Sequence, residues 1–285
     1  QRRRRSLAIA AGAAVVVGVA TVAVAVAGDT SPGPEPASLG HIHALAVDED
    51  ADAVLVATHD GLFRATRDAH LERVGGSRHD LMAFTVTEKG RFYASGHPEL
   101  PDEDRLAPGK PPRPGPAESK DRSETWQPRS LLGDADFHAL ASSDQTLSGA
   151  DAASGQLLVS TDGHTWESRS RLPDHVQSLA VHPGDPDLVV AAAGGELIRS
   201  TDGGRSWKIG GPPDAIAVSW DTRTERLWAV GHDGTLWSST QGDDWSRKGR
   251  SPSGPPHALL AHGDTLWVAS GTDLTVSDDG GATWD

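Results

Sequence analysis

Histidine is the residue type in this chain best suited to chemistry, and eight of the 13 histidines fall beside short apolar segments or in the loops between them. Six stand at the start of such segments, and two lie in connecting loops. The eight are His41, His43, His59, His79, His97, His138, His175 and His257. Asp60, Asp80 and Glu99 add carboxylates to the same stretches.

Imidazole and carboxylate groups that converge on one point can bind a divalent metal such as Zn²⁺ or Cu²⁺. When the imidazoles are protonated, they can instead bind an anionic or polar ligand. A third interpretation is that they fill a wet channel by hydrogen-bonding to water and backbone. The sequence leaves these three readings open.

We expect the apolar segments to be the inner strands of a repeated unit and to position the histidines that lie beside them. The segments cover residues 42–47, 81–86, 137–141, 176–181, 215–218 and 258–261. Aligning them places one residue of each at an equivalent position, namely His43, Met82, His138, Gln177, Asp214 and His257. We expect these residues to form a ring around the mouth of a central channel.

A second repeat fixes the fold. Five tryptophans, Trp126, Trp166, Trp207, Trp245 and Trp284, follow one another at intervals of 40, 41, 38 and 39 residues. Each closes a version of Ser-x-Asp-x-Gly-x-Thr/Ser-Trp, which we term the repeat turn. Its aspartates are Asp121, Asp162, Asp202 and Asp279, and Gln241 replaces the aspartate in the copy that ends at Trp245. Asp can accept backbone N–H groups, Gly can adopt positive φ where the chain reverses, and Trp can pack beneath the turn.

Repetition near 40 residues, with several short strands in each unit, is typical of a β-propeller with one four-stranded blade per repeat. The sequence therefore predicts an all-β, six-bladed β-propeller over residues 41–285, with blades at about 41–78, 79–135, 136–174, 175–213, 214–255 and 256–285. An insertion at 97–118 is predicted to be an exposed loop. The last blade lacks a fourth strand of its own; either residues 37–40 supply it or the sequence is a truncated copy.

The repeat turns resemble the Asp-box, or BNR, repeat found in sialidases, sortilin-type receptor domains and photosystem II assembly factors. The resemblance implies that the turn is structural and lies at the outer edge of a blade, away from any ligand. With His-x-His at 41–43, Thr-His-Asp-Gly-Leu-Phe at 58–63 and Ser-Gly-His-Pro at 95–98, residues 39–285 are similar to bacterial exported Asp-box proteins labelled exo-α-sialidase-like or glycosyl hydrolase-like.

Sialidase chemistry needs three arginines, a tyrosine nucleophile with a glutamate partner, and an aspartate acid/base. The chain contains one tyrosine, Tyr93, in the alternating strand-like segment 91–94. The sialidase Phe/Tyr-Arg-Ile-Pro motif is missing, since Phe63-Arg64 is followed by Ala65-Thr66. The sequence therefore assigns no catalytic residue, and a sialidase-type glycosidase is retained as an alternative.

The N-terminus predicts the compartment. Arg2 to Arg5 precede an uncharged, Ala- and Val-rich run over residues 6–28, which is long enough to cross a bilayer as one helix. Positive charge before the run places the remainder outside the cytoplasm. Residues 1–28 are thus a transmembrane anchor, or a signal peptide cleaved after Ala25-Val26-Ala27. Residues 29–40 form a Pro-rich linker.

The leading prediction is an extracytoplasmic, membrane-tethered binding module with a small ligand, glycan, protein or metal at its His-rich mouth. A protein-interaction scaffold is a second alternative, favoured by the acidic composition and the 97–118 loop. The formal net charge of −14 disfavours nucleic acid as a partner. The chain has no cysteine, so disulfides and a lipoprotein anchor are excluded.

Overall fold

The computed structural model describes residues 39–48, 53–67, 70–97, 113, 115–143, 146–173, 175–252 and 254–285. The predicted anchor or signal segment, most of the linker, and Glu99 with most of the 97–118 insertion lie outside these residues. Among the residues that are described, no helix has the length and apolar character needed to span a bilayer.

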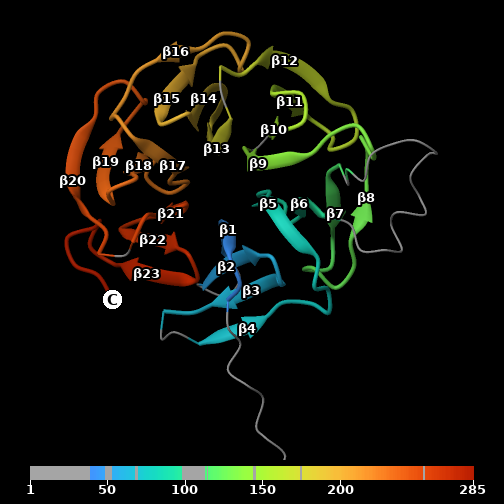
Figure 1. Cartoon of the computed structure of the whole chain (residues 1–285), viewed down its shortest axis with the longest axis horizontal. Coiled ribbons are helices and arrows are strands. Elements are labelled where there is room, and N and C mark those ends of the chain that lie inside the picture. Colours follow the sequence, from blue (N-terminus) through green and yellow to red (C-terminus); the bar gives the residue numbers. More distant parts are fainter. Residues whose placement is uncertain are drawn as a thin grey trace, which may run out of the picture. The chain divides into compact units, whose positions relative to one another are not determined.

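The described chain is a six-bladed β-propeller, as the repeats predicted (Figure 1). Each blade is an antiparallel sheet whose strands follow chain order from the channel outwards. The strands are β1 (Ile42–Asp48), β2 (Ala53–Thr58), β3 (Gly61–Ala65) and β4 (Leu71–Arg73); β5 (Asp80–Val86), β6 (Phe92–His97), β7 (Ala117–Ser119) and β8 (Gln127–Pro128); β9 (Phe137–Ser142), β10 (Leu147–Asp151), β11 (Gln156–Ser160) and β12 (Glu167–Arg171); β13 (Val176–His182), β14 (Asp185–Ala193), β15 (Glu196–Ser200) and β16 (Lys208–Ile209); β17 (Ala215–Trp220), β18 (Leu227–Gly231), β19 (Thr235–Ser239) and β20 (Ser246–Arg250); β21 (Ala258–His262), β22 (Thr265–Ser270) and β23 (Asp273–Ser277).

The hydrophobic core lies between neighbouring blades. One cluster joins Leu157 and Val159 of the third blade to Val189 and Ile198 of the fourth, and equivalent clusters join the other pairs of neighbouring blades. The inner and second strands are rich in Ala and Val because six sheets converge on one axis. Small and β-branched side chains suit the limited space between sheets there.

The repeat turns join the third and fourth strands. In the fourth blade, one carboxylate oxygen of Asp202 accepts the N–H groups of Arg205 and Ser206 at 3.0 and 2.8 Å, and the other accepts the Ser206 hydroxyl at 2.6 Å. The Ser200 hydroxyl accepts the N–H of Gly204 at 2.8 Å. The hydrogen bonds that the Asp202 carboxylate accepts, led by the one from the Ser206 hydroxyl, lower the pKa of Asp202 to about 2.

The repeat turn of the fourth blade also ties that blade to the third. Trp207 Nε1 donates to the hydroxyl of Ser170 on β12, at 2.9 Å, and that hydroxyl donates to the Gly204 carbonyl at 2.6 Å. Gly204 has φ of +82°, and a Cβ there would lie 2.0 Å from Leu157 Cδ2. The position therefore requires glycine for its backbone conformation and for its packing against the neighbouring blade.

Closure of the ring joins the first and last blades. Strand β1 contacts β21, and Ile42 and Phe63 share a buried cluster with Leu260 and Trp267. Arg67 adds an ion pair to Asp278 at 3.2 Å and a hydrogen bond to Thr265 at 3.2 Å.

The sixth sheet has three strands among the described residues, and residues 39 and 40 are not part of it. Asp285 exchanges two backbone hydrogen bonds with Val276 of β23, at 2.9 and 3.1 Å. Asp285 thus stands where a fourth strand would begin.

The two requirements at Gly204 can be separated by experiment. We expect Gly204→Ala to lower the free energy of unfolding by about 1 kcal/mol for the positive φ and by a further ~1–3 kcal/mol for the clash with buried Leu157. Gly195→Ala is the matched control, because Gly195 has the same φ of +82° with nothing within 4 Å of the added Cβ. Urea unfolding measures both. Equal losses in the two variants would show that the contact between blades contributes nothing.

Candidate metal centre at the channel mouth

Three histidines meet where the first blade begins. Strand β1 pairs with β2 so that Ile42 lies opposite Thr58, which brings His41 and His43 beside His59 in the β2–β3 turn. The ring centroids of His43 and His59 are 4.3 Å apart, and those of His41 and His43 are 4.9 Å apart. A register shift between Ile42 and Ala44 leaves His43 at a β-bulge, a device that redirects a side chain.

Asp80, the first residue of β5, supplies a carboxylate from the second blade. Its Oδ1 lies 2.9 Å from His59 Nδ1 and 3.6 Å from His43 Nε2. Gly96 on the neighbouring strand β6 makes room for it, because a Cβ at Gly96 would lie 1.6 Å from the Asp80 carbonyl oxygen. Residue 96 must therefore be glycine if β5 is to hold Asp80 in this place.

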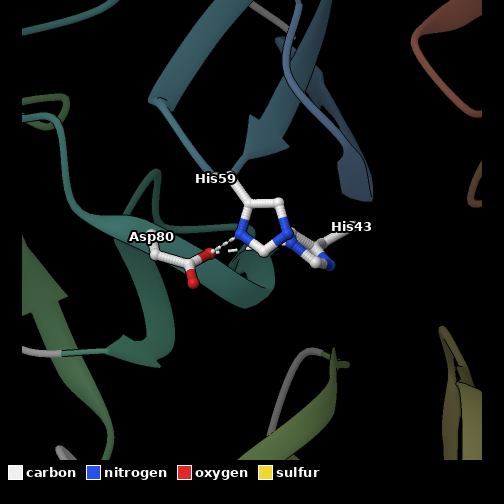
Figure 2. A group of neighbouring side chains, drawn as sticks. All are labelled: His43, His59 and Asp80. Carbon is white, nitrogen blue, oxygen red and sulfur yellow. Dashed lines mark ion pairs between the residues drawn. The ribbon is translucent and has the colours of Figure 1, made fainter.

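Figure 2 shows His43, His59 and Asp80 converging from β1, the β2–β3 turn and β5. One ligand-capable atom of each lies within 4.8 Å of the other two. Two donors bound to one tetrahedral Zn²⁺ at their usual distances of ~2.1 Å would be about 3.4 Å apart. The measured 2.9 and 3.6 Å lie on either side of that value, so small side-chain shifts would accommodate an ion.

The protonation state of His43 also suits metal binding. Burial lowers the pKa of His43 to about 4; His59 lowers it further, and Asp80 opposes the change. His43 is therefore neutral near pH 7, the form in which imidazole binds a metal. Its Nε2 is buried and makes no hydrogen bond within the described structure. Burial, together with the neighbouring His257 and His59, also lowers the pKa of His41.

His257 joins the group but is held differently. Its ring centroid lies 4.7 Å from that of His41, and its Nε2 accepts the Gly271 N–H at 2.5 Å. That bond engages the Nε2 lone pair. His79 Nδ1 lies 2.6 Å from the Ser77 hydroxyl, and the backbone of His97 pairs with Asp80, while the His97 side chain is outside the described structure.

His138 is placed away from this group, on the wall formed by the third blade. Its Nε2 lies 3.5 Å from Asp136 Oδ2, and its ring centroid is 5.7 Å from that of His175. The hydrogen bond to Asp136 raises the pKa of His138 against the effect of burial. Asp136 did not figure among the residues predicted from sequence, although its place two residues before His138 puts both on one face of an extended segment.

The predicted ring is displaced in the fifth blade. Strands β1, β5, β9, β13 and β17 each have a register shift near their start, and the residues left at these shifts include His43, Met82, His138, Gln177 and Ile216. Asp214 lies two residues before Ile216, at a positive φ of 56°. The alignment that gave Asp214 a ring position was therefore wrong, because it did not account for the turn that precedes β17.

Tyr93 lies towards the opposite, repeat-turn end of the propeller, beside Gly163. It is buried, and its hydroxyl donates to Glu118 at 3.1 Å. Burial and then the Glu118 charge raise the pKa of Tyr93. Glu118 is itself ion-paired to Arg91 and Arg129. This network holds β6, β7 and the segment after β8 together within the second blade, and none of the ion pairs or hydrogen bonds of these residues in the described structure involves a histidine.

A cavity of about 160 Å³ runs along the inner strands below the histidines. His43, His138 and His257 line its rim, and Ser142, Ser178 and apolar side chains line its wall. A second cavity of about 330 Å³ opens between the third and fourth blades, and His138 lines this one as well. His138 thus lines both cavities.

No protein-family model matches the sequence, and no curated protein matches it. The fold is similar to that of a GH74 xyloglucanase from Xanthomonas campestris, with a TM-score of 0.59 and 19% identity over 87% of this chain and 38% of that one. It is also similar to virginiamycin B lyase from Staphylococcus aureus, with a TM-score of 0.59 and 12% identity over 87% and 86% of the two chains. A chain in a nidogen–laminin complex is also similar, with a TM-score of 0.62 and 10% identity over 79% of this chain and 89% of that one. These likenesses show the fold alone.

The low pKa of His43 predicts a pH dependence of stability. In the unfolded chain His43 binds its proton near pH 6.5, whereas in the folded chain it does so near pH 4. Between these values the unfolded state binds more protons, so the contribution of His43 is complete above about pH 6.5 and is lost as the pH falls towards about 4.

Urea unfolding at about pH 7.5 and about pH 5 should therefore show a smaller loss of stability in His43→Gln than in the wild type. The exposed His164, on a repeat turn, provides the control variant His164→Gln, which should behave as the wild type. If His43→Gln keeps the full wild-type loss, another group carries the pH dependence.

Proposed function

We propose that this chain is an exported, membrane-tethered Asp-box propeller that binds a divalent transition metal through His43, His59 and Asp80. The observation that carries the proposal is the convergence of two imidazoles and one carboxylate, each with a ligand atom within 4.8 Å of the others. The buried, unbonded Nε2 of His43 supports it, because a buried polar atom without a hydrogen bond is unfavourable unless a partner binds.

The donor set favours Zn²⁺ or Cu²⁺ over Ca²⁺ or Mg²⁺. Imidazole nitrogen suits the former pair, whereas the latter prefer oxygen donors. Two histidines and one carboxylate leave at least one coordination position open, as in sites where an ion binds a further ligand. The structure thus supports a site for ligand capture at the mouth rather than an ion enclosed for stability.

The tether and the compartment rest on the sequence of residues 1–28, in which Arg2 to Arg5 precede an uncharged apolar run. A protein held outside the cytoplasm would meet metal ions and small solutes directly. The Ser-x-Asp turns support the Asp-box assignment through their shared hydrogen-bond pattern at Asp162, Asp202 and Asp279. Because Tyr93 lies at the other end of the propeller, the sialidase alternative has no support in the arrangement of the site.

Zinc titration by calorimetry tests the proposal. We expect the wild type to bind one Zn²⁺, and His59→Ala or Asp80→Asn to weaken the affinity by about 100-fold, because the first removes a ligand and the second removes the negative charge of another. Mg²⁺ should not compete.

His164→Ala is the matched control, since it removes an exposed imidazole from the opposite end of the propeller. The proposal fails if the wild type binds no Zn²⁺ or Cu²⁺ in stoichiometric amount. It also fails if His164→Ala weakens binding as much as His59→Ala does.

A further inference from the structure

We propose that the metal centre hydrolyses small, uncharged carboxylic esters, with the His138–Asp136 pair donating the proton to the departing alcohol. The inference rests on the proposed metal site and assigns it a reaction. It is carried by the position of His138, which occupies the bulge in the third blade that His43 occupies in the first.

The equivalence of the two bulges places His43 and His138 at the same depth in the channel. Both line the rim of the same 160 Å³ cavity, and the Asp80 charge contributes to the raised pKa of His138. The metal ligands and the His138–Asp136 pair therefore face one mouth from the first and third blades, with Asp80 of the second blade between them.

His138 has the features of a proton donor. Its Nε2 is directed at Asp136 Oδ2, 3.5 Å away, which orients the ring. With Nε2 turned to Asp136, Nδ1 is the ring nitrogen left to donate to a substrate, and the side chain remains 30% exposed. The raised pKa keeps a proton on the ring at a higher pH than for a free histidine, and a donor works best when its pKa lies near the working pH.

The reaction uses water and needs no other reactant. A Zn²⁺ held by His43, His59 and Asp80 would lower the pKa of a bound water; that water would lose one proton to solvent, and its oxygen would add to the carbonyl carbon of the ester. The bond from that carbon to the alcohol oxygen then breaks, and the departing oxygen takes the proton from His138. The carboxylic acid formed returns a proton to His138, so the products are a carboxylate, an alcohol and one released proton.

Charge and size select the substrate class. Asp60, Asp80 and Asp136 lie near the mouth, and the chain has a net charge of −14, so a dianionic phosphate ester is repelled. The cavity between the third and fourth blades, about 330 Å³, would take the alcohol portion beside His138; it is lined by Leu172, Pro173 and Val176 and by the polar Asp151, Ser154, Arg171 and His175. A small neutral ester satisfies both conditions.

Two esters with different leaving groups provide the test. The full chain loaded with one Zn²⁺ is assayed with phenyl acetate, p-nitrophenyl acetate and p-nitrophenyl phosphate. We expect turnover of both acetates and none of the phosphate. His138→Gln should lower kcat for phenyl acetate by about 100-fold, because phenolate needs a proton to leave, and for p-nitrophenyl acetate by less than about threefold.

Asp136→Asn should lower kcat for phenyl acetate in the same sense and by a smaller factor. His182→Gln, which changes a histidine on an inner strand at the other end of the channel, should leave both rates unchanged. Zinc titration of each variant shows whether the metal site is intact.

If the wild type binds Zn²⁺ but hydrolyses phenyl acetate no faster than Zn²⁺ in buffer, the proposed reaction is wrong and the metal site stands. If His138→Gln slows both acetates equally, His138 does not act on the leaving group. If the wild type binds no Zn²⁺, the proposed function itself has failed.

Discussion

Contact between neighbouring blades is the constraint on which the rest of the molecule depends. A single blade of three or four short strands cannot bury both of its faces alone, so each is stable only between two neighbours. The first blade therefore needs the last, and the packing of Ile42 and Phe63 against Leu260 and Trp267 completes the ring. The proposed metal centre depends on contact between blades in the same way, because His43 and His59 lie on the first blade and Asp80 on the second.

The bulges at the start of the inner strands determine which side chains face the channel at the mouth. A regular strand directs alternate side chains to its two faces, towards the neighbouring blades. One extra residue at the bulge re-aims a side chain towards the axis. His43 and His138 take that position in two blades, while Gln177 and Ile216 take it in two others. The imidazole groups at these bulges therefore lie on the side of the mouth formed by the first and third blades, although the fold itself repeats.

The fold could be predicted from the sequence because the turn pattern recurs at nearly constant spacing and each copy needs the same residues for local reasons. The gathering of histidines could be anticipated from their places beside the inner strands. Which of these residues converge could not be predicted from the sequence, since the convergence of His43, His59 and Asp80 depends on the bulge at His43 and on the close approach of β5 and β6 at Gly96. Asp214 is the example: only the register between β17 and β18 shows that Ile216, two residues later, takes the position at the bulge.

The two ends of the propeller differ in their resistance to acid. The repeat-turn carboxylate of Asp202 keeps its hydrogen bonds down to a pH of about 2, whereas His43 takes up a proton near pH 4. A falling pH would thus add charge to the mouth while the outer turns remain bonded. Because a protonated imidazole cannot bind a metal, acid would release an ion from the proposed centre while the Asp202 turn keeps its hydrogen bonds.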